Sequence, residues 1–64
     1  RNQFPGTVTA VTKGATTSHV TIDIGSGIAV TSSITNNAVE ELGLKPGARA
    51  IAVIKASDVL VGVP

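Results

Sequence analysis

Hydrophobic and polar residues alternate along several stretches of this chain, and the alternation predicts strands. The clearest stretch is Val20-Thr21-Ile22-Asp23-Ile24. A period of two is typical of a strand with one buried face. Residues 4–12 and 28–34 follow a similar pattern. Val11 breaks the alternation in the first of these, which predicts a bulge or the end of the strand there.

Two further strands are predicted in the second half of the chain. Residues 49–54 are apolar at both parities, and a strand that is apolar on both faces is normally covered on both faces. In so short a chain, another subunit is a plausible cover. Residues 59–63 again alternate, around Leu60 and Gly62, and predict a last strand.

A short helix is predicted between the third and fourth strands. Asn37 is a suitable N-cap, and Glu40 three residues later completes a capping-box pattern. Gly43 suits the left-handed position after the last turn. Lys45-Pro46-Gly47 then has the residues of a type II turn.

This order of elements predicts an all-β fold: a five-stranded OB-like Greek-key barrel with one short helix between strands 3 and 4. Sixty-four residues form a single domain, residues 1–64. A domain of this size often needs disulfides, metals or partner subunits for stability. The chain has no cysteine for a disulfide and only one histidine for a metal site, so partner subunits are the remaining means of stabilisation.

Composition argues against several classes of function. The chain lacks a cysteine nucleophile, and adjacent strand residues Ser18 and His19 point to opposite faces, so we expect no enzyme. A net charge of +1 and a single Phe do not provide the basic, aromatic surface that binds single-stranded nucleic acid. No apolar run approaches the roughly 20 residues of a membrane span.

Two short polar clusters are the candidates for binding an oxyanion. Lys55-Ala56-Ser57-Asp58, between two predicted strands, offers an ammonium group, a hydroxyl and backbone amides. Arg1-Asn2 offers a guanidinium and a carboxamide. Such donors bind anions when they converge. Taken alone, however, Arg1 and Lys55 are better interpreted as ordinary solvated charges than as parts of a binding site.

The chain as a whole resembles the molbindin (Mop) family. The resemblance rests on five segments in the same order along the chain: Arg1-Asn2-Gln3, Val20-Thr21-Ile22-Asp23-Ile24-Gly25, Ile34-Thr35-Asn36, Glu40-Glu41-Leu42-Gly43-Leu44 and Ile54-Lys55-Ala56-Ser57. It implies a cytoplasmic protein that binds molybdate, and tungstate, without transforming it, and that has no organic cofactor and no directly coordinated metal ion. It also implies a homo-oligomer, a hexamer built as a trimer of dimers, with anion sites at subunit interfaces and no nucleic acid or membrane as partner.

The resemblance also implies which residues bind the anion. The family's Ser-x-Arg-Asn and Lys-Ala-Ser motifs match the following residues, the serine of the first falling before residue 1: Arg1, Asn2, Lys55, Ala56 and Ser57. On this basis we expect the two clusters to meet around one oxyanion, each from a different subunit. A second site in the family uses the turn after strand 1, and the corresponding residues here are Ala15, Thr17, Ser18, His19 and Val20. Residues 16–19 depart from the commoner family pattern Val-Asn-Ala-Glu, although hydroxyls and a histidine do not repel an anion.

Three functions stay open at this point. The chain is a free-standing molybdate store or buffer, or it is the sensing or oligomerisation module of a transcriptional regulator or transporter ATPase. The third alternative is a structural barrel whose anion sites have decayed.

Overall fold

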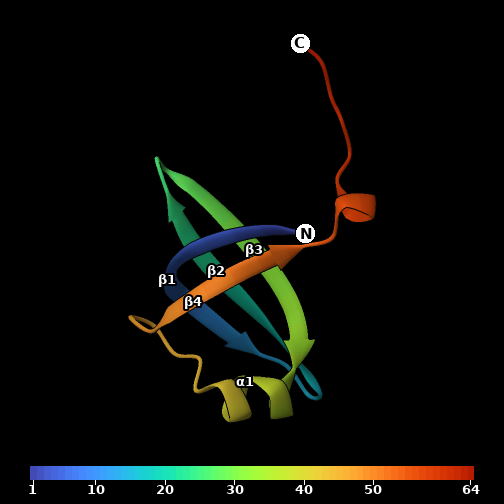
Figure 1. The fold of residues 1–64 in the computed structure, drawn as a ribbon. Coiled ribbons are helices and arrows are strands. Elements are labelled where there is room, and N and C mark those ends of the chain that lie inside the picture. Colours follow the sequence, from blue (N-terminus) through green and yellow to red (C-terminus); the bar gives the residue numbers. More distant parts are fainter.

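The structure is a computed structural model that describes all 64 residues. It contains four strands, one α-helix and one turn of 3-10 helix (Figure 1). In chain order these are β1 (Asn2–Lys13), β2 (Thr17–Gly25), β3 (Ile28–Thr35), α1 (Asn36–Leu42), β4 (Arg49–Ile54) and η1 (Ala56–Asp58).

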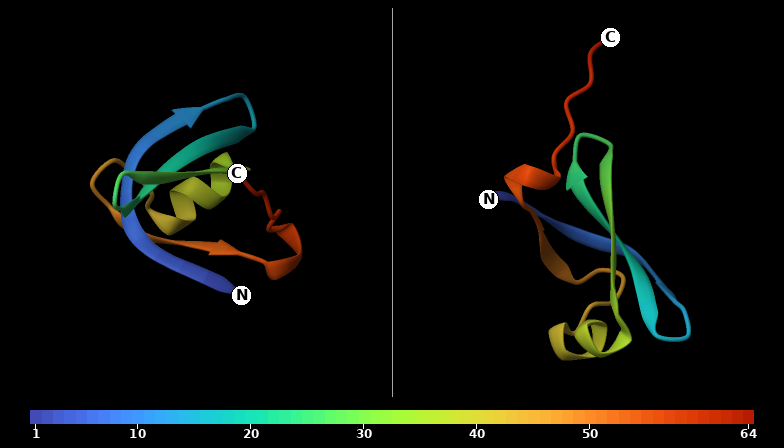
Figure 2. Two further views of the ribbon diagram at one scale, coloured as in Figure 1. Left: turned by 90° about the horizontal axis from the view of Figure 1, so that it is seen from above. Right: turned by 90° about the vertical axis from the view of Figure 1, so that its right-hand side faces the viewer.

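The four strands form one antiparallel sheet in the order β3-β2-β1-β4. β1 is long enough to pair with two different strands: its residues 2–7 pair with β4, and its residues 7–13 pair with β2. The sheet therefore curls into a half-barrel, which is clear when it is seen from above (Figure 2). Gly6 lies at the curl, where a Cβ atom would come within 2.3 Å of the Asp23 carbonyl oxygen. Only glycine permits this approach.

The strand alternation predicted from the sequence is confirmed by burial. The core consists of Val8, Val20, Ile22 and Ala52, which come from β1, β2 and β4. β4 spans the predicted residues, but only one of its apolar faces is covered within the chain. Ile51 and Val53, at the other parity, are 55% and 54% exposed.

The turn between α1 and β4 follows the prediction. The Ala48 amide donates to the Lys45 carbonyl at 2.9 Å, and Gly47 has φ 93°, as a type II turn requires. Ser26 and Gly27 connect β2 to β3 with positive φ at both positions. A bulge is present in β1, but it falls between Val8 and Ala10 rather than at Val11.

The predicted N-cap of the helix is wrong by two residues. Thr35 is the N-cap, and its hydroxyl accepts a hydrogen bond from the Ala38 amide at 3.1 Å. The Asn37–Glu40 capping box does not form, since Asn37 already lies inside the helix. The C-terminal prediction is confirmed: Gly43 has φ 65°, and the Leu44 amide donates to the Val39 carbonyl at 3.0 Å.

The predicted fifth strand is absent. Residues 59–64 have no regular secondary structure, and the chain leads them away from the sheet (Figure 1). The 3-10 turn at Ala56–Asp58 breaks the path from β4, so no hairpin forms. Besides an alternating sequence, a strand needs a neighbouring strand that forms hydrogen bonds with its backbone amides and carbonyls. The barrel of a single chain is consequently open between β3 and β4.

Candidate functional site

The pairing of β1 with β4, the first and last strands along the chain, places the two predicted clusters at the same end of the sheet. β1 and β4 are antiparallel, with Asn2 opposite Ile54. The Asn2 carboxamide also donates to the Ile54 carbonyl at 3.2 Å. Arg1 precedes Asn2 and Lys55 follows Ile54, so both residues lie at the same end of the sheet (Figure 1).

The segment after β4 is a compact, exposed turn. Lys55 has extended backbone and precedes the 3-10 helix, and the Asp58 amide donates to its carbonyl at 2.9 Å. The Val59 amide donates to the Ala56 carbonyl at 3.2 Å. The amides of Ala56 and Ser57 come first in this helix and have no acceptor within the turn. Together with the Ser57 hydroxyl, they are the donors that this turn offers.

Charge and exposure suit a site for an anion. Arg1, Lys55 and Ser57 are all exposed, and Asn2 is half-buried. We expected the two clusters to come from different subunits. The antiparallel register already places them side by side in one chain, a proximity that no local sequence pattern reveals.

The residues of the second predicted site are divided between two faces of β2. Ser18 and Val20 are each 1% exposed and point into the core, whereas Thr17 and His19 are exposed on the other face. The Ser18 hydroxyl donates to the Asn36 side-chain oxygen at 2.5 Å. Ser18 therefore has a structural role in this chain, and the five residues do not converge on one point.

Asn36 is the polar residue that the sequence analysis left without a role. Its side-chain amide donates to the carbonyls of Gly14 (3.1 Å) and Ala15 (3.3 Å), while its oxygen accepts from Ser18. It thus joins the β1–β2 turn to the start of α1. The signal in the sequence was a Thr-Asn pair between a strand and a helix, where Asn side chains often bond to nearby backbone.

A shallow hollow lies beside Asn36. Its lining is mostly polar and consists of Lys13, Ala15, Thr16, Thr35, Asn36, Asn37 and Glu40. Of the predicted second-site residues it contains only Ala15. The Glu40 carboxylate at its rim would repel a dianion.

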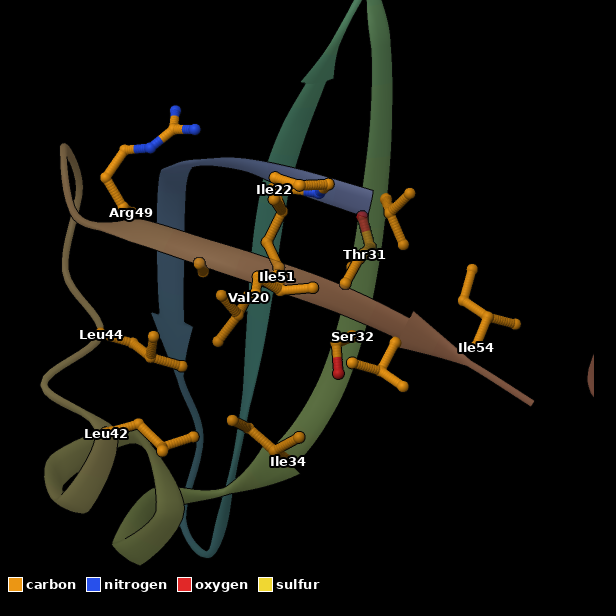
Figure 3. A pocket seen from close by; sticks show the side chains of 15 residues that line it. Val20, Ile22, Thr31, Ser32, Ile34, Leu42, Leu44, Arg49, Ile51 and Ile54 are labelled. Atoms are coloured by element: carbon orange, nitrogen blue, oxygen red, sulfur yellow. The ribbon is translucent and has the colours of Figure 1, made fainter. Parts of the chain in front are cut away.

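A second hollow is different in character. It is an apolar groove of about 910 Å³ (Figure 3), bordered mainly by β2, β3 and β4. Eleven of its 15 lining residues are hydrophobic, so it offers few donors to an oxyanion. The polar end at Arg1 and Lys55 is the better candidate for the anion.

No group of three or more His, Cys, Asp or Glu side chains is placed to hold a metal ion. No helix is both long and apolar enough to cross a membrane.

Comparison with known proteins gives a consistent family assignment. The family profile described as the TOBE domain matches residues 1–61. Molybdenum-pterin-binding protein 1 of Clostridium pasteurianum is 46% identical over 61 residues, which are 95% of this chain and 90% of that protein.

Two longer proteins contain a similar segment. The molybdenum transport protein ModE of Herbaspirillum seropedicae is 46% identical over 63 residues, 98% of this chain and 23% of that protein. The solved structure of ModG, a cytoplasmic molybdate-binding protein with molybdate bound, superposes with a TM-score of 0.96 at 53% identity. That match covers all of this chain and 45% of ModG.

Proposed function

We propose that this chain, which belongs to the TOBE domain family and to its molbindin members, binds molybdate as an intact oxyanion and does not catalyse a reaction. Its OB-like fold is that of the molbindins. The observation that carries the proposal is the pairing of Asn2 with Ile54, which places the segments Arg1-Asn2 and Lys55-Ala56-Ser57 at the same end of the β1–β4 pair.

The chemistry of molybdate explains why these residues suit it. Molybdate is a tetrahedral dianion, so its site needs donors on several sides. Arg1 and Lys55 offset its charge, and the Ser57 hydroxyl and adjacent amides supply directed hydrogen bonds. A hydrogen bond to a charged partner contributes roughly 1.5–3 kcal/mol. Tungstate has the same charge and shape, so the proposal extends to it.

The site of one chain leaves part of the anion uncovered. All of its donors belong to one exposed end of the sheet, and Arg1, Lys55 and Ser57 are open to solvent. A second chain at this end would supply donors to the remaining side. We therefore place the site at a subunit interface in a homo-oligomer, and we propose a hexamer, a trimer of dimers, as the assembly.

A second anion site at the turn after β1 is a subordinate proposal. Ala15, Thr17 and His19 are exposed there, and Ser18 and Val20 shape the strand from inside. Because Ser18 is bonded to Asn36, we assign it no direct contact with the anion. This site would depend on donors from a neighbouring chain more than the first one does.

The proposed cellular role is storage and buffering of molybdate in the cytoplasm. The alternative is a sensing or oligomerisation module within a longer protein. The observation that favours the alternative is the match to ModE, of which this chain covers 23%. Light scattering on the full-length gene product separates the two: an assembly of chains of 6.4 kDa supports storage, and a longer polypeptide supports the module.

Thermal unfolding tests the binding itself. A ligand that binds only the folded state at 100 times its dissociation constant stabilises that state by about 2.7 kcal/mol. For a domain of this size, this corresponds to a rise in Tm of roughly 10 °C or more. We expect excess molybdate or tungstate to produce such a rise relative to buffer with sodium chloride of equal ionic strength. A melting curve that neither oxyanion moves would contradict the proposal.

A further inference from the structure

The turn after β4 contains three of the residues assigned to the anion, and few contacts attach it to the sheet. Its two backbone hydrogen bonds, which the Asp58 and Val59 amides donate, lie within the turn. No hydrogen bond of the structure joins residues 55–58 to the sheet. The turn therefore holds its own shape, while its direction depends on the peptide group between Ile54 and Lys55.

The pairing of β4 with β1 ends at this peptide group. β4 is an edge strand, paired on one side only, and Asn2 opposite Ile54 is the last pair of its register. The Asn2 carboxamide donates to the Ile54 carbonyl at 3.2 Å. The other side-chain hydrogen bond between these two strands, from Arg49 to Thr7, lies at the opposite end of β4. Asn2 is therefore the side chain that secures the end of β4.

This hydrogen bond also limits the direction of the residues that follow. A peptide group is planar, so the direction of its carbonyl fixes the direction of its amide. The Ile54 carbonyl and the Lys55 amide belong to one such group. By holding the carbonyl, Asn2 restricts rotation on either side of the group, and with it the direction in which the turn leaves the sheet.

Asn2 itself is poorly suited to contact a dianion. One N–H of its carboxamide is used by the Ile54 carbonyl, and the carboxamide oxygen only accepts hydrogen bonds. Asn2 is also half-buried, whereas Arg1 and Lys55 are exposed. We propose that Asn2 is a positioning residue, whose hydrogen bond to Ile54 holds the turn in place for the anion, and that it does not contact the anion itself. The inference rests on the proposed function and replaces the direct role that the resemblance implied for Asn2.

A turn held in place before binding increases affinity. An ordered site loses less conformational entropy when the ligand binds. Without the Asn2 hydrogen bond, residues 55–58 would sample more directions in the free protein, and the anion would have to order them. The expected cost is that of one neutral hydrogen bond, which is about 3- to 10-fold in the dissociation constant.

Asn2→Ala tests this role against a matched control. Thr9→Ala also removes a side-chain hydrogen bond to the backbone of a neighbouring strand, in this case to the Thr21 carbonyl. We expect Asn2→Ala to bind molybdate about 3- to 10-fold more weakly in isothermal titration calorimetry and Thr9→Ala to bind it like the wild type. Unchanged affinity for Asn2→Ala, or an equal loss in both variants, would overturn the proposal.

Nuclear magnetic resonance relaxation of the backbone amides distinguishes positioning from direct contact. In ligand-free Asn2→Ala we expect lower order parameters than in the wild type for residues 55–58, with β2 and β3 unchanged, and excess molybdate should restore them. Weaker binding with an unchanged ligand-free turn would instead indicate direct contact. Order lost across the whole sheet, with a lower Tm, would indicate a general structural role. Either result would overturn the proposal.

The same experiments separate this inference from the proposed function. A wild type that binds no molybdate would contradict both of them. A wild type that binds molybdate, beside an Asn2→Ala variant of equal affinity, would contradict the positioning role alone.

Discussion

The charged residues of the candidate site differ from the other charges of the chain by their position. Lys45 and Lys55 are both exposed lysines. Lys45 lies in the turn between α1 and β4, at the opposite end of β4 from the candidate site. Lys55 lies at the same end of the sheet as Arg1 and Asn2, because residues 2–7 of β1 pair with the whole of β4 and Asn2 is opposite Ile54. Similar side chains therefore have different expected roles.

Replacement of Lys55 tests this assignment. We expect Lys55→Ala to weaken molybdate binding by about 10- to 150-fold, the equivalent of one charged hydrogen bond. The Tm of the ligand-free protein should not change, because the side chain is exposed. Isothermal titration calorimetry measures the change, and Lys45→Ala is the matched control. Equal affinity for Lys55→Ala and Lys45→Ala would remove Lys55 from the site.

At the scale of elements, the sequence correctly predicted the features that depend on local periodicity and on turn-forming residues. The alternation in residues 20–24, the Pro46-Gly47 turn and the glycine after α1 are all present. The N-cap was wrong because Thr35 and Asn37 are both good capping residues by sequence. Asn36 decides between them: its bonds to the β1–β2 turn fix where the helix starts.

Loss of Asn36 should therefore destabilise the fold. Asn36→Ala would leave the buried Ser18 hydroxyl without its acceptor and the Gly14 and Ala15 carbonyls without their donor. We expect the free energy of unfolding to fall by about 1–3 kcal/mol. Asn37→Ala, at the exposed next position, should change it by no more than about 0.5 kcal/mol. Urea denaturation of the two variants measures the difference, and equal stabilities would show that the Asn36 network contributes nothing.

At the scale of the whole molecule, the sequence predicted an OB-like barrel, and the chain alone forms an open half of one. The fifth strand failed as a prediction because periodicity reports which face of a segment is apolar, and says nothing of whether a neighbouring strand pairs with the segment. Ile51 and Val53 show the same limit, because the sequence predicted cover on both faces of β4 and the chain itself covers only one of them. The candidate site is similar in this respect: its residues were predicted from resemblance, the shared end of the sheet follows from strand register, and its closure by a second chain is a proposal.

The most direct test of the central claim is the molybdenum content of the protein. The full chain is equilibrated with molybdate, freed of unbound anion by gel filtration, and analysed by elemental mass spectrometry beside Lys55→Ala and a protein-free blank. We expect molybdenum to elute with the wild-type assembly in a fixed ratio to the chain, and in much smaller amount with Lys55→Ala. A wild-type fraction with no more molybdenum than the blank would contradict molybdate binding by this chain.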